Sequence, residues 1–146
     1  MNSTVSITKV FRFEMAHALH GHGGKCAHIH GHSYRLEVTI KGTPINDPVR
    51  PDHGMVMDFA VLKSIVQRHI LDRFDHALLL SERDSHAFPD ADGLFKRLEY
   101  TRFQPTCEHL VLEMARVLCL HLPPTVAIRR LRLWETATSY AEWEDL

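Results

Sequence analysis

The sequence has no excess of either charge and no long apolar run. Seventeen Lys and Arg residues nearly balance eighteen Asp and Glu, so the formal net charge is −1 with histidine neutral. Proteins that bind the phosphate backbone of nucleic acids normally carry a basic excess, so we expect no nucleic-acid partner. No apolar stretch approaches the roughly 20 residues that span a bilayer, so we expect no membrane span either.

Cysteine is scarce and odd in number, with only Cys26, Cys107 and Cys119. Residues 1–6 also lack the basic-then-apolar pattern of a secretory leader. Together these absences argue against a disulfide framework and favour a reducing cytoplasm. Cys119 lies in an apolar stretch and Cys107 near an expected helix start, so we predict that both are buried packing residues.

The composition is that of an ordinary globular chain. Hydrophobic residues make up 45% and charged residues 24% of its 146 residues, which excludes global disorder. There is no internal repeat, and no linker long enough to divide the chain. We therefore predict a single domain over residues 1–146, large enough to bury a core.

Alternation of apolar and polar residues predicts the strands. Residues 5–17 and 34–41 alternate well enough to be half-buried strands. Residues 126–135 form a third, whose apolar parity shifts in a way that predicts a bulge near Arg129-Arg130. A last short strand fits residues 140–143.

Helical spacing predicts two helices between these strand pairs. The first spans about residues 59–74 with Asp58 as its cap, and the second begins after Thr106 and ends at Pro123-Pro124. Residues 97–103 could add a short edge strand. The order ββααββ predicts an α+β fold, a four-stranded antiparallel sheet with two helices on one face.

Histidine is the residue in excess. Six of the twelve histidines fall between residues 17 and 32. If the second strand extends back through His30 and His32, both project on one face, and an antiparallel hairpin brings His17 beside them. Three imidazoles on one face suit zinc with an open fourth position, or another divalent first-row metal.

The remaining histidines carry no such signal. Those in the Gly-rich stretch are expected to be solvated loop residues or to support the ligands, and those elsewhere receive the same plain interpretation. The first group is His20, His22 and His28, and the second is His69, His86, His109 and His121.

Cys26 has several interpretations. Four residues before His30 and next to Lys25, it could be a fourth ligand that closes a structural metal site. It could equally be a thiolate that acts as general base or nucleophile, since a nearby cation and lysine favour ionisation. A buried inert thiol is disfavoured by its polar, Gly-rich neighbours.

Two carboxylates are further candidates. Asp75 precedes His76 and could fix its tautomer for proton transfer, although a histidine at a helix C-terminus could simply oppose the helix dipole. Glu135 falls on the parity of buried leucines, where a carboxylate needs a partner. A ligand with two adjacent N–H donors would satisfy it, unless it reaches solvent at the strand end.

Six segments, in order along the chain, resemble the 6-pyruvoyl-tetrahydropterin synthase / 6-carboxytetrahydropterin synthase family. They read FEMAH, KCAHIHGHSY, MDFAVLK, FDH, PTCEHL and WET, and they occupy residues 13–17, 25–34, 57–63, 74–76, 105–110 and 134–136. The resemblance covers most of the chain between about residues 5 and 140.

The resemblance implies a tunnelling fold (T-fold) whose subunits form homohexamers, as dimers of trimers, with active sites at subunit interfaces. Position by position, it implies zinc ligands at His17, His30 and His32, a catalytic cysteine at Cys26, and a proton-relay pair at Asp75 and His76. It also implies a pterin anchor at Glu135 and a residue near the pterin at Thr106.

The implied substrate is 7,8-dihydroneopterin triphosphate. Three residues separate Cys26 from His30, as in the bacterial carboxy enzymes, which make 6-carboxytetrahydropterin for queuosine synthesis. The pyruvoyl branch, which stops before side-chain cleavage, is the alternative. From the residues alone, a non-catalytic zinc module and a zinc hydrolase stay open. Segment 81–104 is longer than in compact family members.

Overall fold

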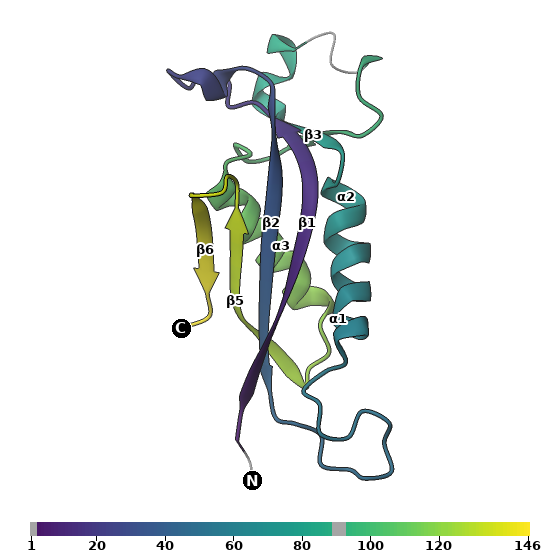
Figure 1. The fold of residues 1–146 in the computed structure, drawn as a ribbon. Helices are drawn as coiled ribbons and strands as arrows, with labels where there is room; N and C mark the ends of the chain where they lie inside the picture. Colours follow the sequence, from purple (N-terminus) through teal and green to yellow (C-terminus); the bar gives the residue numbers. More distant parts are fainter. Residues whose placement is uncertain (1–2, 89–92) are drawn as a thin grey trace.

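A computed structural model describes residues 3–88 and 93–146. Its centre is a six-stranded sheet in the order β4-β3-β1-β2-β5-β6 (Figure 1). The strands are β1 (Val5–His17), β2 (His30–Gly42), β3 (Ala77–Ser81), β4 (Leu98–Thr101), β5 (Val126–Trp134) and β6 (Tyr140–Glu144). In the described part no helix is long and apolar enough to cross a membrane.

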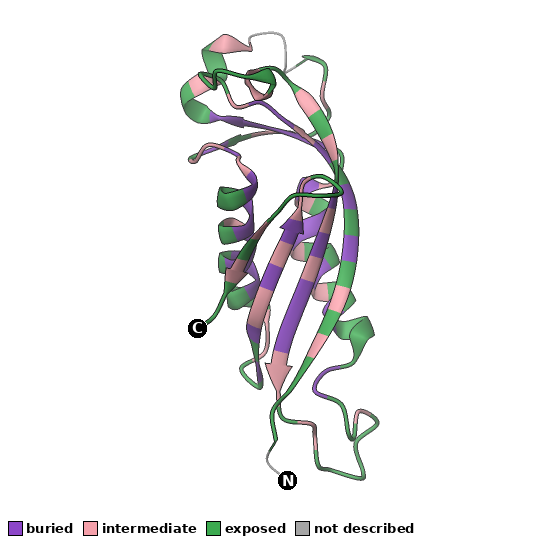
Figure 2. Cartoon of the chain, turned by 60° about the vertical axis from the view of Figure 1, so that its left-hand side comes forward, coloured by how far each residue is buried: buried purple, intermediate pink, exposed green. Residues whose placement is uncertain are grey.

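The two long strands follow the predicted alternation. Along β1, every second residue from Phe11 to His17 is buried, and the burial bands in Figure 2 show the same alternation. β1 pairs antiparallel with β2 in a register that sets Phe13 opposite Tyr34 and His17 opposite His30. The second strand thus begins at His30, four residues before its predicted start, and the condition set for His30 and His32 to share one face is met.

Two helical segments cover one face of the sheet. The first begins as α1 (Phe59–Val66), passes through a π-helical turn at Gln67–Leu71 and ends as α2 (Asp72–Phe74). The second is α3 (Cys107–His121). The predicted caps are confirmed, because the side chains of Asp58 and Thr106 accept hydrogen bonds from Ala60 N and His109 N.

The core lies between this face and the helices. Buried residues of β1, β2 and β5 pack with the apolar sides of α1 and α3 in one cluster, which includes Phe13, Leu36, Leu62, Met114 and Leu133. The α+β class and the placement of both helices on one face are therefore confirmed.

The prediction of four antiparallel strands is wrong. β3 and β4 lie between the helices in sequence, and they add to the β1 edge as parallel strands. β3 carries the unbroken apolar run Ala77–Leu80 because both of its faces are buried: Ala77 and Leu79 in the main core, Leu78 and Leu80 in a second cluster. A run without alternation gave no strand signal. β4 confirms the predicted edge strand.

Arg73 fastens the added strands to the helices. At the end of the first helical segment, its guanidinium binds Glu99 of β4 and Glu113 of α3. Hydrogen bonds from Arg116 and then from Arg73 lower the pKa of Glu113 to about 2, against an opposing effect of burial.

The bulge predicted in β5 is confirmed. Thr39 of β2 faces Arg130, whereas the next residue, Ile40, faces Ile128, so Arg129 is the extra residue. The inward-facing residues therefore change from Val126 and Ile128 to Leu131 and Leu133.

Candidate metal centre

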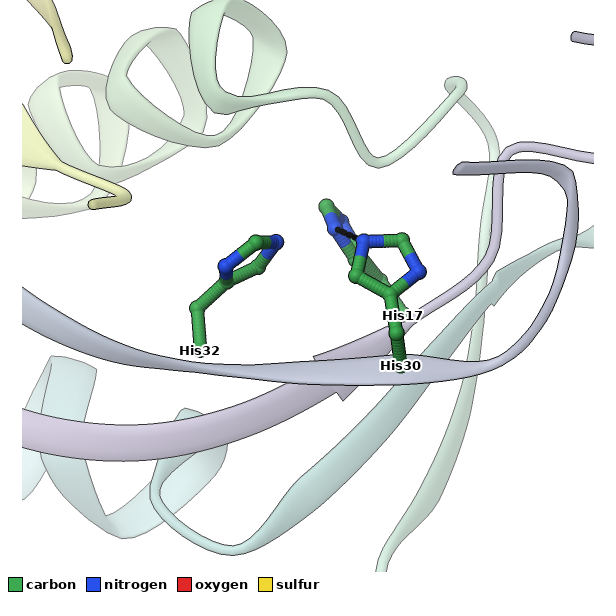
Figure 3. Close-up of side chains that lie close together, drawn as sticks. All are labelled: His17, His30 and His32. Atoms are coloured by element: carbon green, nitrogen blue, oxygen red, sulfur yellow. Dashed lines mark hydrogen bonds between the residues drawn. The ribbon is translucent and has the colours of Figure 1, made fainter. Parts of the chain in front are cut away.

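Three histidines converge at one end of the β1–β2 pair (Figure 3). His17 ends β1 opposite His30, and His32 lies two residues further along β2 on the same face. Their ligand nitrogens all lie within 4.8 Å of one another. The convergence predicted from strand parity is therefore confirmed.

Backbone carbonyls orient two of the three rings. The Nδ1 of His17 lies 2.7 Å from the carbonyl oxygen of Pro105, and the Nδ1 of His30 lies 2.7 Å from that of His28. A carbonyl oxygen only accepts, so each Nδ1 carries the proton and donates it. Each Nε2 is then left with a free lone pair, the usual arrangement in histidines that bind a metal.

The free nitrogens have no good partner within the protein. The Nε2 atoms of His17 and His30 lie 3.0 Å apart. With both Nδ1 atoms protonated, two lone pairs face each other. The Nε2 of His32 is buried without a hydrogen-bond partner among the described residues. A cation between the three would resolve both conflicts, and tetrahedral Zn–N bonds would set neighbouring nitrogens about 3.3 Å apart.

The electrostatic environment favours the neutral form of His17 and His32. Burial lowers the pKa of His17 to about 4, partly opposed by its bond to Pro105, and the neighbouring His30 and His32 lower it further. Burial also lowers the pKa of His32, with Glu135 opposing. Neutral imidazole is the form that binds metals, so the cluster can accept a divalent transition metal.

Glu135 lies against the cluster. Its Oε1 is 3.5 Å from the Nε2 of His17 and 3.6 Å from the Nε2 of His32. It follows β5 directly, and its backbone N–H is held by the carbonyl of Ser139. The expectation that Glu135 shares the inward parity of Leu133 is confirmed by this placement.

Thr106 lies near the three histidines because it directly follows Pro105, which contacts His17. Its side chain caps α3, and the residue before it, Pro105, supplies the carbonyl that orients His17. These orienting carbonyls of Pro105 and His28 were not foreseen, because every residue carries one and side-chain patterns do not mark them.

Cys26 is near the cluster in sequence but is not a member of it. It lies half-buried in a 3₁₀ turn, Lys25–Ala27, and its carbonyl accepts from Leu19 N. Within the described residues, its sulfur is not among the ligand atoms that gather around His17. The chain on its own therefore does not form a closed site of three histidines and a cysteine.

The other two cysteines differ from each other. Cys107 is buried, its thiol donates to the carbonyl of Leu133, and burial raises its pKa to about 12, so its predicted packing role is confirmed. Cys119 is exposed, so the prediction that it is buried is wrong. It borders a surface hollow together with residues of β5 and β6, and the apolar residues beside it in the sequence do not reveal its exposure.

Asp75 and His76 form a pair at the end of the first helical segment. The Nδ1 of His76 lies 2.9 Å from Oδ1 of Asp75, which also accepts from the backbone N–H of Glu14. His76 has a φ of 60°, rare for a residue other than glycine, and its own N–H is bound by the Glu14 carbonyl. The pair is thus held rigidly at the edge of β1.

The pair and the three histidines do not meet within one chain. The side chain of His76 is 78% exposed and borders a hollow with Glu14, Ala16 and Ser33, which have the opposite strand parity to His17. Of the three clustered histidines, only His32 also borders this hollow.

The remaining histidines match their plain interpretation. The three in the Gly-rich stretch, His20, His22 and His28, are exposed loop residues. His69 and His121 stack on each other between the first helical segment and α3, with ring centroids 3.6 Å apart.

Comparisons with known proteins agree on one family. The family model described as 6-pyruvoyl tetrahydropterin synthase matches residues 6–145. A 6-carboxy-5,6,7,8-tetrahydropterin synthase of Haemophilus influenzae is 39% identical over 144 residues, covering 95% of this chain and 98% of its own. Another so named, from Aquifex aeolicus, is 29% identical over 164 residues and covers 95% and 97%.

Solved structures show the same fold. An uncharacterized protein from Wolinella succinogenes superposes with a TM-score of 0.79 at 20% identity, covering 99% of both chains. The 6-pyruvoyl tetrahydropterin synthase of Caenorhabditis elegans gives 0.69 at 25% identity, covering 99% of this chain and 97% of its own.

Proposed function

Because the chain belongs to the 6-pyruvoyl tetrahydropterin synthase family, we propose that it is a zinc-dependent lyase of the carboxy branch. It converts 7,8-dihydroneopterin triphosphate to 6-carboxy-5,6,7,8-tetrahydropterin, acetaldehyde and triphosphate, in the cytoplasm, for queuosine and other 7-deazaguanine synthesis. Membership of the family supports the assignment to the lyase class. The identity of the metal, of the product and of the pathway is what we propose.

One observation carries the proposal: a carboxylate lies beside three metal-ready imidazoles. Glu135 is within 3.6 Å of two of the histidine nitrogens. It can accept hydrogen bonds from the 2-amino group and ring N–H of a pterin in a bidentate manner. A pterin anchored there, near Thr106, has its side chain next to the metal position.

The three histidines would hold the zinc. Zinc, when bound, is a Lewis acid for the side-chain hydroxyls of the substrate and so acidifies the adjacent C–H positions. His17, His30 and His32 supply three ligands and leave a position for substrate, as catalytic zinc sites do. The protein also orients two of these rings, because the carbonyls of Pro105 and His28 accept hydrogen bonds from Nδ1 of His17 and of His30.

Proton movement is assigned to Cys26 and to the Asp75–His76 pair. Cys26, as thiolate, takes a proton from the substrate side chain. The Nδ1 of His76 donates its hydrogen bond to the carboxylate of Asp75, so Nε2 has the lone pair that takes up and releases a proton. Asp75 thereby fixes the tautomer and the orientation of the ring.

A complete site requires more than one copy of the chain. His76 projects outward on the other side of β1 from His17, and it is mostly exposed. The sheet also ends in two short edge strands, β4 and β6, whose outer backbone groups can pair with another copy. Figure 1 shows β6 at one side of the sheet. We propose a homohexamer, two trimers stacked, in which His76 of one subunit serves the metal centre of another.

The runner-up is a 6-pyruvoyl-tetrahydropterin synthase, which eliminates triphosphate without cleaving the side chain. The carboxy product is favoured by the names of the Haemophilus and Aquifex relatives. A non-catalytic zinc module is disfavoured because Cys26 does not close the metal site.

The decisive experiment is incubation of zinc-loaded protein with 7,8-dihydroneopterin triphosphate, followed by mass analysis. The expected products are 6-carboxytetrahydropterin and acetaldehyde in equal amounts. A stable 6-pyruvoyl product would move the chain to the runner-up. Unchanged substrate, with zinc bound at one ion per chain, would contradict both lyase reactions.

A further inference from the structure

A polar hollow lies beside the metal centre and has no role in the chemistry described above. It has a volume of about 590 Å³ and is lined by His20, Ser81, Arg83, Asp84, Arg102, Phe103, Gln104 and His109. Six of these eight residues come from the long segment 81–104. This segment thus supplies most of the cavity wall.

The hollow is cationic. Arg83 and Arg102 contribute two guanidinium groups, against one carboxylate from Asp84, and the two histidines can add charge when protonated. Neither guanidinium forms an ion pair with any residue the structure describes. Six other guanidinium groups are matched with carboxylates, at Arg35, Arg50, Arg73, Arg116, Arg130 and Arg132, whereas Arg12, Arg68, Arg97 and Arg129 form no ion pair among the described residues.

The wall of the hollow is continuous with the metal centre. The Gln104 carbonyl accepts from Nδ1 of His109, and its side chain reaches the carbonyl of His20. The next carbonyl along the chain, that of Pro105, orients His17. One short loop therefore contacts both a metal ligand and the cationic hollow.

Unpaired arginines in a hollow suit an anion with several oxygens. The guanidinium fork matches phosphate geometry and donates two parallel hydrogen bonds, which makes arginine a strong phosphate ligand. Two arginines from different parts of the segment, beside the donor groups of Ser81 and Gln104, suit a chain of phosphates better than a single one.

We propose that this hollow binds the triphosphate arm of the substrate, with Arg83 and Arg102 as its main ligands. The inference rests on the proposed function for the identity of the substrate. Segment 81–104 is then a substrate-binding insertion. Asp84 lowers the affinity for an anion, and it limits how tightly released triphosphate stays bound.

The test uses zinc-loaded protein and inorganic triphosphate as probe, with binding measured by calorimetry and zinc content measured before and after. The double variant Arg83→Gln/Arg102→Gln is compared with Arg68→Gln, an exposed arginine on the first helical segment that also forms no ion pair among the described residues. We expect the double variant to bind triphosphate at least tenfold more weakly, and Arg68→Gln to bind like the unmodified protein. Asp84→Asn should bind more tightly.

Steady-state kinetics provide a second, independent test of the two arginines. The double variant should raise KM for 7,8-dihydroneopterin triphosphate about tenfold or more, and leave the affinity for the dephosphorylated 7,8-dihydroneopterin unchanged. Equal triphosphate affinity in the double variant and in Arg68→Gln would overturn the inference, as would no triphosphate binding by an enzyme that still turns the substrate over. Triphosphate binding that depends on the two arginines, without turnover, would overturn the proposed reaction and leave an anion site standing.

Discussion

The Nε2 atoms of His17 and His30 lie 3.0 Å apart, and each ring donates a hydrogen bond from its protonated Nδ1 to a backbone carbonyl. Two lone pairs at this distance repel each other, so the arrangement is stable only with a cation or an additional proton between them. Metal binding therefore relieves a conflict that the fold itself creates.

This relationship predicts which histidines the metal requires. His30→Ala removes one ligand, and we expect the affinity for zinc to fall at least a hundredfold, measured by competition with a chromogenic chelator. His28→Ala is the matched control, since its side chain is exposed and only its backbone carbonyl orients His30. Zinc affinity that survives in His30→Ala would place the metal elsewhere.

Cys26 is predicted to act in chemistry and not in metal binding. Cys26→Ala should keep one zinc per chain and an unchanged melting temperature, while product formation falls by a factor of a thousand or more. The control is Cys119→Ala, whose thiol is exposed on α3. Loss of zinc together with stability in Cys26→Ala would instead support a structural cysteine ligand.

Glu135 is predicted to anchor the pterin. Glu135→Gln retains the size of the side chain but loses its charge and one acceptor, so a bidentate pair of hydrogen bonds becomes mismatched. We expect pterin affinity to fall by about 2 kcal/mol, roughly thirtyfold, in a fluorescence titration. Glu144→Gln, an exposed residue of β6, should bind as before. Normal affinity in Glu135→Gln would exclude the anchor.

Arg73 is predicted to stabilise the inserted strands. Arg73→Leu leaves Glu99 without its cation and Glu113 with Arg116 alone, and since the guanidinium of Arg73 is only partly buried we expect a loss of about 1–3 kcal/mol in the free energy of unfolding by urea. Arg68→Leu on the same helical segment serves as control. A double variant with Glu99→Gln should recover part of the loss, because it removes the carboxylate left without a cation.

The stacked pair His69 and His121 predicts a dependence of stability on pH. Partial burial, and then the nearby His121 and Arg68, lower the pKa of His69. The folded protein therefore binds fewer protons at His69 than the unfolded chain does. The contribution of His69 to the free energy of unfolding is thus fully present above the ordinary histidine pKa of about 6.5 and is lost as pH falls below it.

The measurement is the slope of unfolding free energy against pH between about pH 5 and 7. His121→Gln should reduce that slope, because it removes the neighbouring charge that lowers the His69 pKa. His53→Gln, an exposed loop variant, should leave the slope unchanged. An identical slope in all three proteins would show that the stacked pair does not couple to folding.

Sequence patterns predict most of the fold, and the exceptions have physical reasons. β1, β2 and α3 each have one face in the core and one in water, so periodicity reveals them. β3 does not alternate because it is buried on both faces, and a run of four apolar residues is too short to identify. The position of Cys119 was missed because neighbouring apolar residues do not fix which side of a helix a residue occupies.

Sequence patterns likewise predict some residues of the candidate site and miss others. Strand parity brings His17, His30 and His32 together, and it also places Glu135 on their side, because each lies on a regular strand or next to one. The relation of His76 to this group depends on how α2 meets the edge of β1, which no periodicity encodes. The orienting carbonyls of His28 and Pro105 belong to loops and leave no mark in the sequence.

The bulge in β5 decides which side chain reaches the metal centre. Val126 and Ile128 need one phase of the strand in order to be buried, and Leu131, Leu133 and Glu135 need the other. If the strand ran through Arg129 without a bulge, the chain could bury Val126 and Ile128 or present Glu135 to His17, but not both, and Thr136 would take the inward position. The bulge at Arg129, six positions before Glu135, therefore makes a buried apolar face and an inward-facing glutamate compatible in one strand.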